Sequence, residues 1–69
     1  MNEKKLKHEL ERSLSWATDG GFSREKENTQ TEIQRRLIDA HQRVHGSNLR
    51  AASIAVGSAF ERGKRYAKR

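Results

Sequence analysis

The cationic side chains at the C-terminal end are the residues whose types and spacing point most directly to binding chemistry. Residues 47–69 contain six lysines and arginines and a single acid, whereas residues 1–46 contain nine lysines and arginines against eight acids. Most of the net charge of +6 therefore belongs to one end of the chain. A concentration of this kind indicates a surface for an anionic ligand.

Six residues of this end, all within 62–69, are the candidate nucleic-acid-binding set: Arg62, Lys64, Arg65, Tyr66, Lys68 and Arg69. On a helix the three arginines share one side, and the two lysines form a second stripe about a third of a turn away. Arginine binds phosphate through two parallel hydrogen bonds and lysine binds it as a point charge. The tyrosine between them can stack on a base or bond to a phosphate. The alternative is a solvated helix end whose cations complement the helix dipole.

Residues 49–66 match part of the helix-turn-helix pattern. Ser53 supplies the small residue four positions before the turn glycine, Gly57, and Val56 supplies the apolar residue directly before it. Ser58 and Gly63 occupy positions where this pattern has apolar side chains. The match is partial, and it requires the chain to turn at Gly57.

Small side chains and two isoleucines indicate an interface. Ala51 and Ala55 permit another helix to approach closely, and Ile54 between them projects away from the apolar face. Ile38 likewise lies off the apolar stripe of its own helix. In a chain with few large apolar side chains, these residues favour self-association or a protein partner. The alternative is that both isoleucines pack beneath the segment 20–28.

No motif predicts catalysis, a cofactor or a metal site. His41 and His45 have the i, i+4 spacing that can hold a metal ion, but the sequence offers no evident third ligand. No nucleophile stands beside a base in a recognisable motif, and no glycine-rich loop is present to bind phosphate. We therefore expect a protein that is not an enzyme.

The elements that position these residues are predicted to be helices. Leu6, Leu10, Leu14 and Ala17 form one apolar stripe, which predicts a helix over about 3–18, capped by Asn2 and ended by Gly20-Gly21. Trp16 is expected at the edge of its buried face, and Phe22 is expected to fill the core from the loop 20–28, with Ser23 as an alternative helical start.

A second helix over about 30–45 is predicted from a Thr29–Glu32 capping box. It carries Ile33, Leu37, Ala40 and Val44 on one face and ends at Gly46. A third helix is expected from about 48, with Ser47 as its cap. Its apolar face comprises Leu49, Ala52, Val56, Ala59, Phe60 and Gly63.

Two patterns disagree about Gly57. A second capping box, Ser58 to Glu61, would end one helix and begin another there. The apolar face instead runs through this position without a break. A glycine inside a helix costs only about 1 kcal/mol, so we favour a continuous helix.

Together these patterns predict an all-α fold: a small antiparallel bundle of three helices, or four if the last breaks at Gly57. Residues 1–69 would form one domain with a basic end at 62–69. The absence of cysteine fits a cytoplasmic protein, and no apolar run is long enough to span a membrane. We expect a small nucleic-acid-binding regulatory protein that forms a dimer or a larger oligomer through its alanine-rich third helix. The alternative is a protein-interaction module, an adaptor or inhibitor that docks on another protein.

Overall fold

The structure of the protein, a computed structural model, describes residues 3–67. Over this range it contains α1 (Glu3–Thr18), a short 3-10 helix η1 (Gly21–Arg24), α2 (Glu27–His45) and α3 (Leu49–Ala67). The prediction of an all-α, three-helix fold is confirmed. The expected cap residue Asn2 lies outside the described residues.

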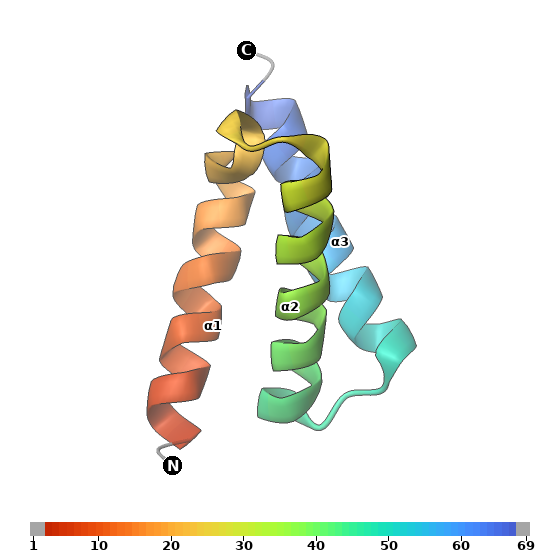
Figure 1. Cartoon of the computed structure of the whole chain (residues 1–69). Helices are drawn as coiled ribbons and strands as arrows, with labels where there is room; N and C mark the ends of the chain where they lie inside the picture. Colours follow the sequence, from red (N-terminus) through yellow and green to blue (C-terminus); the bar gives the residue numbers. More distant parts are fainter. Residues whose placement is uncertain (1–2, 68–69) are drawn as a thin grey trace.

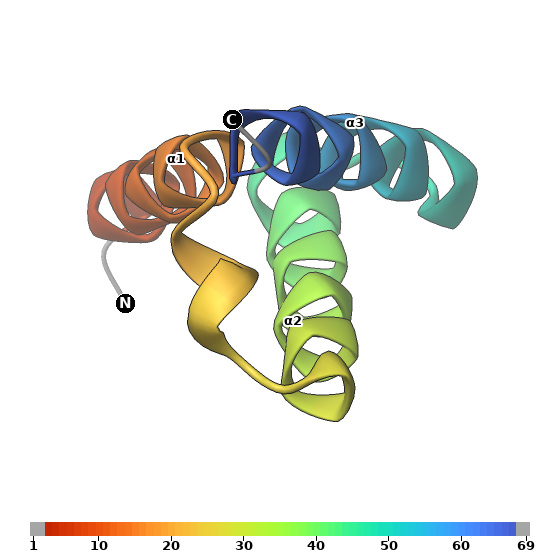
Figure 2. The same cartoon turned by 90° about the horizontal axis from the view of Figure 1, so that it is seen from above.

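The three long helices alternate in direction (Figure 1). Because α2 runs antiparallel to both neighbours, α1 and α3 are parallel and their C-terminal ends lie at the same end of the bundle (Figures 1 and 2). This arrangement brings the end of α1 beside the basic half of α3, although the two segments are far apart in the sequence.

The core is formed by one cluster of apolar side chains from all three helices and η1. Its buried members are Leu10, Ala17, Phe22, Leu37, Val56 and Phe60, and Ala52 is buried as well. Partly buried side chains pack against the cluster: Leu14, Ile33, Ile38, Ala40, Val44 and Ala59. The apolar stripes predicted for the three helices therefore supply most of the core.

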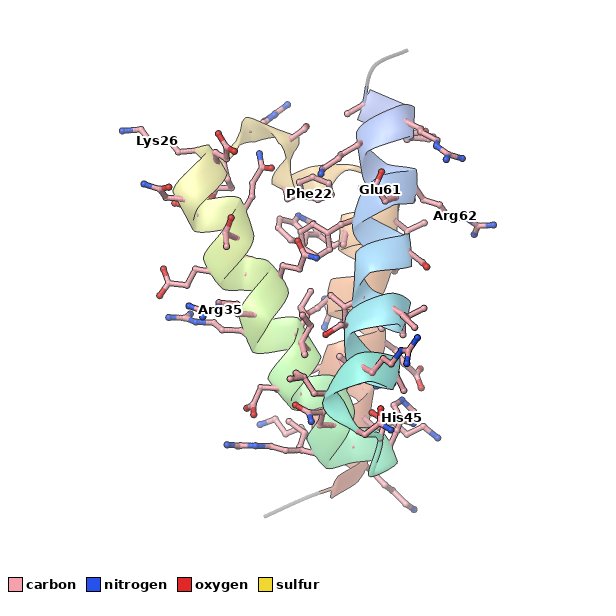
Figure 3. All side chains as sticks on the ribbon, turned by 90° about the vertical axis from the view of Figure 1, so that its right-hand side faces the viewer. Phe22, Lys26, Arg35, His45, Glu61 and Arg62 are labelled. Atoms are coloured by element: carbon pink, nitrogen blue, oxygen red, sulfur yellow. The ribbon has the colours of Figure 1, made fainter. Side chains whose placement is uncertain are left out.

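Phe22 fills the core from η1, as predicted. Its side chain is only 1% exposed, and its ring centroid lies 4.5 Å from that of Phe60. The ring also makes an edge contact with Trp16, at a centroid distance of 6.4 Å. Figure 3 shows Phe22 between α2 and α3 at the end where these helices diverge. The half-exposed Trp16 lies at the edge of the buried face, as expected.

The parallel helices α1 and α3 come into close contact at Gly63. An ideal Cβ built on Gly63 would overlap the carbonyl oxygen of Ala17 and would lie 2.6 Å from Cε1 of Phe22. At the end of α1, Gly20 adopts the left-handed conformation, with φ of 82°. A Cβ there would lie 2.9 Å from the Gly63 carbonyl oxygen. Glycine is therefore required for this close approach of the two backbones.

The predicted start of the second helix is wrong by three residues. α2 begins at Glu27, after the extended residue Lys26, which makes no side-chain cap. Thr29 lies inside the helix, so the Thr29–Glu32 capping box does not form. Instead, the side-chain amide of Gln30 donates to the carbonyl of Glu25 at 2.8 Å, and the Gln30 backbone N–H bonds to Lys26. The 3-10 turn over Gly21–Arg24, not a start at Ser23, leads into this helix.

The third helix is continuous from Leu49 to Ala67. Its cap is Asn48 and not Ser47, because the Asn48 side-chain oxygen accepts the backbone N–H of Ala51 at 2.8 Å. Leu49, predicted on the buried face, is 63% exposed. The physical reason is its position in the first turn, which extends away from α1 at the lower right of Figure 1. Gly46 ends α2 as expected.

The helix-turn-helix hypothesis for residues 49–66 is wrong. It needs a turn at Gly57, and that residue is in the middle of α3. The Ser58–Glu61 capping box is likewise not used, since both residues lie within the same helix. Ala52, Val56 and Phe60 are buried on both sides of Gly57 along the helix. The free energy gained from their packing exceeds the helix-propensity penalty of the glycine, so the helix stays unbroken.

Candidate nucleic-acid interface

The members of the predicted set that the structure describes are all exposed on the C-terminal half of α3. Arg62, Lys64 and Arg65 are exposed, and the side chain of Tyr66 is 61% exposed. Figure 3 shows Arg62 projecting outward from α3, on the side away from α2. The remaining two members of the predicted set, Lys68 and Arg69, lie outside the described residues.

The end of α1 adds a second wall to this surface. Thr18 and Asp19 line an open groove together with Arg62, Arg65 and Tyr66. The parallel packing at Gly63 creates this groove, because it holds the end of α1 against the last turns of α3. The groove therefore joins two guanidinium groups, a phenol and a carboxylate.

Two groups of this groove have definite electrostatic or hydrogen-bonding roles. The Thr18 hydroxyl donates to the carbonyl of Leu14 at 2.8 Å, so only its acceptor capacity faces a ligand. Asp19 is an exposed acid that lowers the positive potential of the groove. Sequence reasoning missed both residues. Nothing local marks them as partners of residues 62–66, because the contact depends on the parallel packing of α1 and α3.

One ion pair reduces the basic character of α3. Lys64 Nζ lies 3.7 Å from Glu61 Oε1, and both side chains are more than half exposed. Exposed pairs of this type contribute little to stability and can be exchanged for another ligand. Among the ion pairs found within residues 3–67, none includes Arg62 or Arg65. An anionic ligand could therefore contact these two arginines without displacing any of these ion pairs.

The four residues predicted for an interface are not equivalent in the structure. Ile54 is 61% exposed, Ala51 is exposed and Ala55 is partly buried. Ile38 is partly buried and packs against the core. The reading in which both isoleucines pack beneath the loop is therefore excluded for Ile54, while Ile38 has an intramolecular role.

His41 and His45 form a cluster at the turn between α2 and α3. Their ring centroids are 4.6 Å apart, and Nδ1 of His41 lies 2.8 Å from the Ser47 hydroxyl. This bond explains why Ser47 does not cap α3. The part of the chain that the structure describes contains no group of three or more potential metal ligands.

The histidine cluster predicts a loss of stability in mild acid. Burial lowers the pKa of His41, and the charge on His45 lowers it further. A histidine with a lower pKa in the folded chain favours unfolding once protonated. The contribution of His41 to the free energy of unfolding is therefore complete above its pKa in the unfolded chain, about 6.5. It is lost as the pH falls toward the lower pKa that His41 has in the folded chain.

We expect urea unfolding at a series of pH values to show this loss, and His41→Gln to make the stability less dependent on pH between neutral and mildly acidic solution. His45→Gln removes only the second cause and should retain part of the dependence. An unchanged pH profile in His41→Gln would contradict this assignment.

No helix within residues 3–67 has the length and apolar character needed to cross a bilayer. Comparisons with protein-family models, with curated proteins and with solved structures find no match to this chain.

Proposed function

We propose that the protein is a cytoplasmic, non-enzymatic regulatory protein that binds nucleic acid through the C-terminal half of α3. The observation that carries the proposal is the exposure of Arg62 and Arg65 on the wall of one groove, beside Tyr66. Two guanidinium groups three residues apart on a helix can bind neighbouring phosphates of one strand. Lys64 adds a third cation close by, and the tyrosine can stack on a base or bond to a phosphate.

The charges around the groove also set a limit on affinity. Asp19 repels a phosphate, and Glu61 competes for Lys64. Binding would therefore rest on a small number of phosphate contacts and would be strongly weakened by salt. Such a protein would recognise the backbone of nucleic acid more than the base sequence.

The test is a titration of fluorescently labelled DNA and RNA at several salt concentrations. Arg62→Gln/Arg65→Gln should weaken binding to every sequence and should flatten the slope of log K against log salt by about two units. The matched control is Arg35→Gln/Arg36→Gln, which removes two exposed arginines from α2. Figure 3 shows Arg35 projecting away from α3. The control should keep the slope within about half a unit of its original value.

Asp19→Asn provides a change in the opposite direction. Removal of the carboxylate should strengthen binding at low salt, by an amount that shrinks as salt is added. A protein that binds neither DNA nor RNA at low salt would refute the proposal. Equal losses in the α3 and α2 double variants would also refute it, because binding would then follow net charge and not this groove.

A protein-interaction module, acting as an adaptor or inhibitor, is the second candidate function. The exposure of Ile54 beside Ala51 favours it, because a large apolar side chain on an open helix face suits a protein contact. The two candidates differ in their response to salt. Binding to a protein through Ile54 would be insensitive to salt and would be abolished by Ile54→Arg, whereas Arg62→Gln/Arg65→Gln would leave it intact.

A further inference from the structure

The outward side of α3 carries a second stripe whose spacing is typical of a helix that packs on a partner. Arg50, Ile54, Gly57 and Glu61 follow one another at intervals of four, three and four residues. This is the period of helices packed side by side. At about 100° per residue, the stripe is centred roughly 130° from the buried side of α3, and Gly57 lies at its edge nearest α2. Contacts in the core therefore do not account for it.

Ile54 in this stripe lines an open hollow beside the small residues of α3. The hollow lies between α2 and α3. Small residues, Ser53, Gly57 and Ser58, line one end of it, and charged residues, Glu61, Arg62, Lys64 and Arg65, line the other. A Cβ built on Gly57 would meet a single atom within 4 Å, Nε2 of Gln34 at 3.9 Å. A branched apolar side chain beside a hollow that can receive one is a self-complementary surface, as a two-fold interface requires.

We propose that α3 packs antiparallel against α3 of a second copy of this chain to form a two-fold symmetric dimer. With the axis between Ala55 and Val56, Ile54 lies opposite Gly57 of the partner subunit. In the same register, Arg50 lies opposite Glu61 of the partner subunit. The symmetry repeats each contact, so the dimer contains two such apolar contacts and two such ion pairs.

Charge complementarity selects the antiparallel direction. In a parallel pair, each Arg50 would face the same residue of the other copy, and each Glu61 would do the same. In the antiparallel pair, both arginines face acids. Glu61 pairs with Lys64 at 3.7 Å within one chain, but this pair is more than half exposed and is easily exchanged for the new one.

The dimer does not rest on the proposed nucleic-acid function, although the two surfaces meet at one end of the hollow, which Arg62 and Arg65 also line. Arg62 lies outside the 50–54–57–61 stripe and lines both this hollow and the groove at the end of α1. The interface is one pair of helices in contact over about three turns, which is small for a stable complex. We therefore expect a dissociation constant between about 1 μM and 1 mM.

The first test measures the molecular mass of the full chain by sedimentation equilibrium over this concentration range, without nucleic acid. Ile54→Arg should raise the dissociation constant about a hundredfold or more, because each dimer loses two buried apolar side chains. The matched control is Leu49→Arg. It introduces the same residue on the same helix, at a position that is 63% exposed and lies outside the stripe. This control should dimerise as the original protein does.

The second test exchanges the charges and establishes the register. Arg50→Glu or Glu61→Arg alone should weaken the dimer about tenfold at low salt, because each makes both ion pairs repulsive. The variant Arg50→Glu/Glu61→Arg should restore most of the loss. A wild-type chain that is monomeric up to about 1 mM would overturn the proposal. A dimer that Ile54→Arg does not weaken, or that the double exchange does not rescue, would overturn it as well. Since nucleic acid is absent, these outcomes do not depend on the proposed function.

Discussion

Gly63→Ala is expected to lower the free energy of unfolding by about 3 kcal/mol, although alanine is the better helix former by about 1 kcal/mol. The added methyl group would overlap the Ala17 carbonyl oxygen, and it would lie 2.6 Å from a carbon of the buried Phe22 ring. The first obstacle is backbone and the second is a side chain that is 1% exposed, so neither can move aside without disturbing the core. Helices α1 and α3 would have to separate.

Gly57→Ala is the matched control, because it makes the same change six residues earlier in the same helix. Its methyl group would meet only Gln34 Nε2, at 3.9 Å, which is an ordinary contact. We therefore expect a gain of up to about 1 kcal/mol from helix propensity alone. Urea unfolding in dilute solution, followed by circular dichroism, measures both changes without a contribution from self-association. Equal effects of the two substitutions would show that α1 and α3 do not meet at Gly63.

The helices themselves could be predicted because their signals are local. The leucines of α1 and the apolar residues of α2 recur at the spacing of one helix face. The structure places most of these side chains in or against the core. The N-terminal ends were harder to predict, since several polar residues compete to cap each helix. Asn48 and Ser47 are both good cap residues, and a bond to His41 in the previous helix withdraws Ser47 from α3.

The groove at the basic end could be predicted only in part. The clustering of cations near the end of the sequence pointed to Arg62 and Arg65, and Tyr66 was included because it lies among them. This charge asymmetry can be read without knowledge of the fold. Thr18 and Asp19 join them through contact between segments more than forty residues apart. That contact depends on Gly63, which the sequence marked only as one more position on an apolar face. What such a glycine packs against becomes clear only when both helices are in place.

Phe22→Ala is expected to cost about 3–5 kcal/mol, enough to unfold much of so small a domain. The ring comes from a four-residue 3-10 helix and fills the space between the diverging ends of α2 and α3 (Figure 3). It lies against Phe60 and edge-on to Trp16, so its loss would leave a cavity that two aromatic neighbours line. Since Phe22 is the one buried residue of η1, its loss would also weaken the attachment of this segment to the core.

Thermal and urea unfolding followed by the fluorescence of Trp16, the one tryptophan of the chain, measure this change directly. Tyr66→Ala is the control, because it removes an aromatic ring that is 61% exposed and should alter stability by less than about 0.5 kcal/mol. Phe22→Leu keeps most of the apolar volume and should lie between the two. If Phe22→Ala were as stable as Tyr66→Ala, the loop would not contribute to the core. The contact of α1 with α3 at Gly63 would then have to hold that end of the bundle without it.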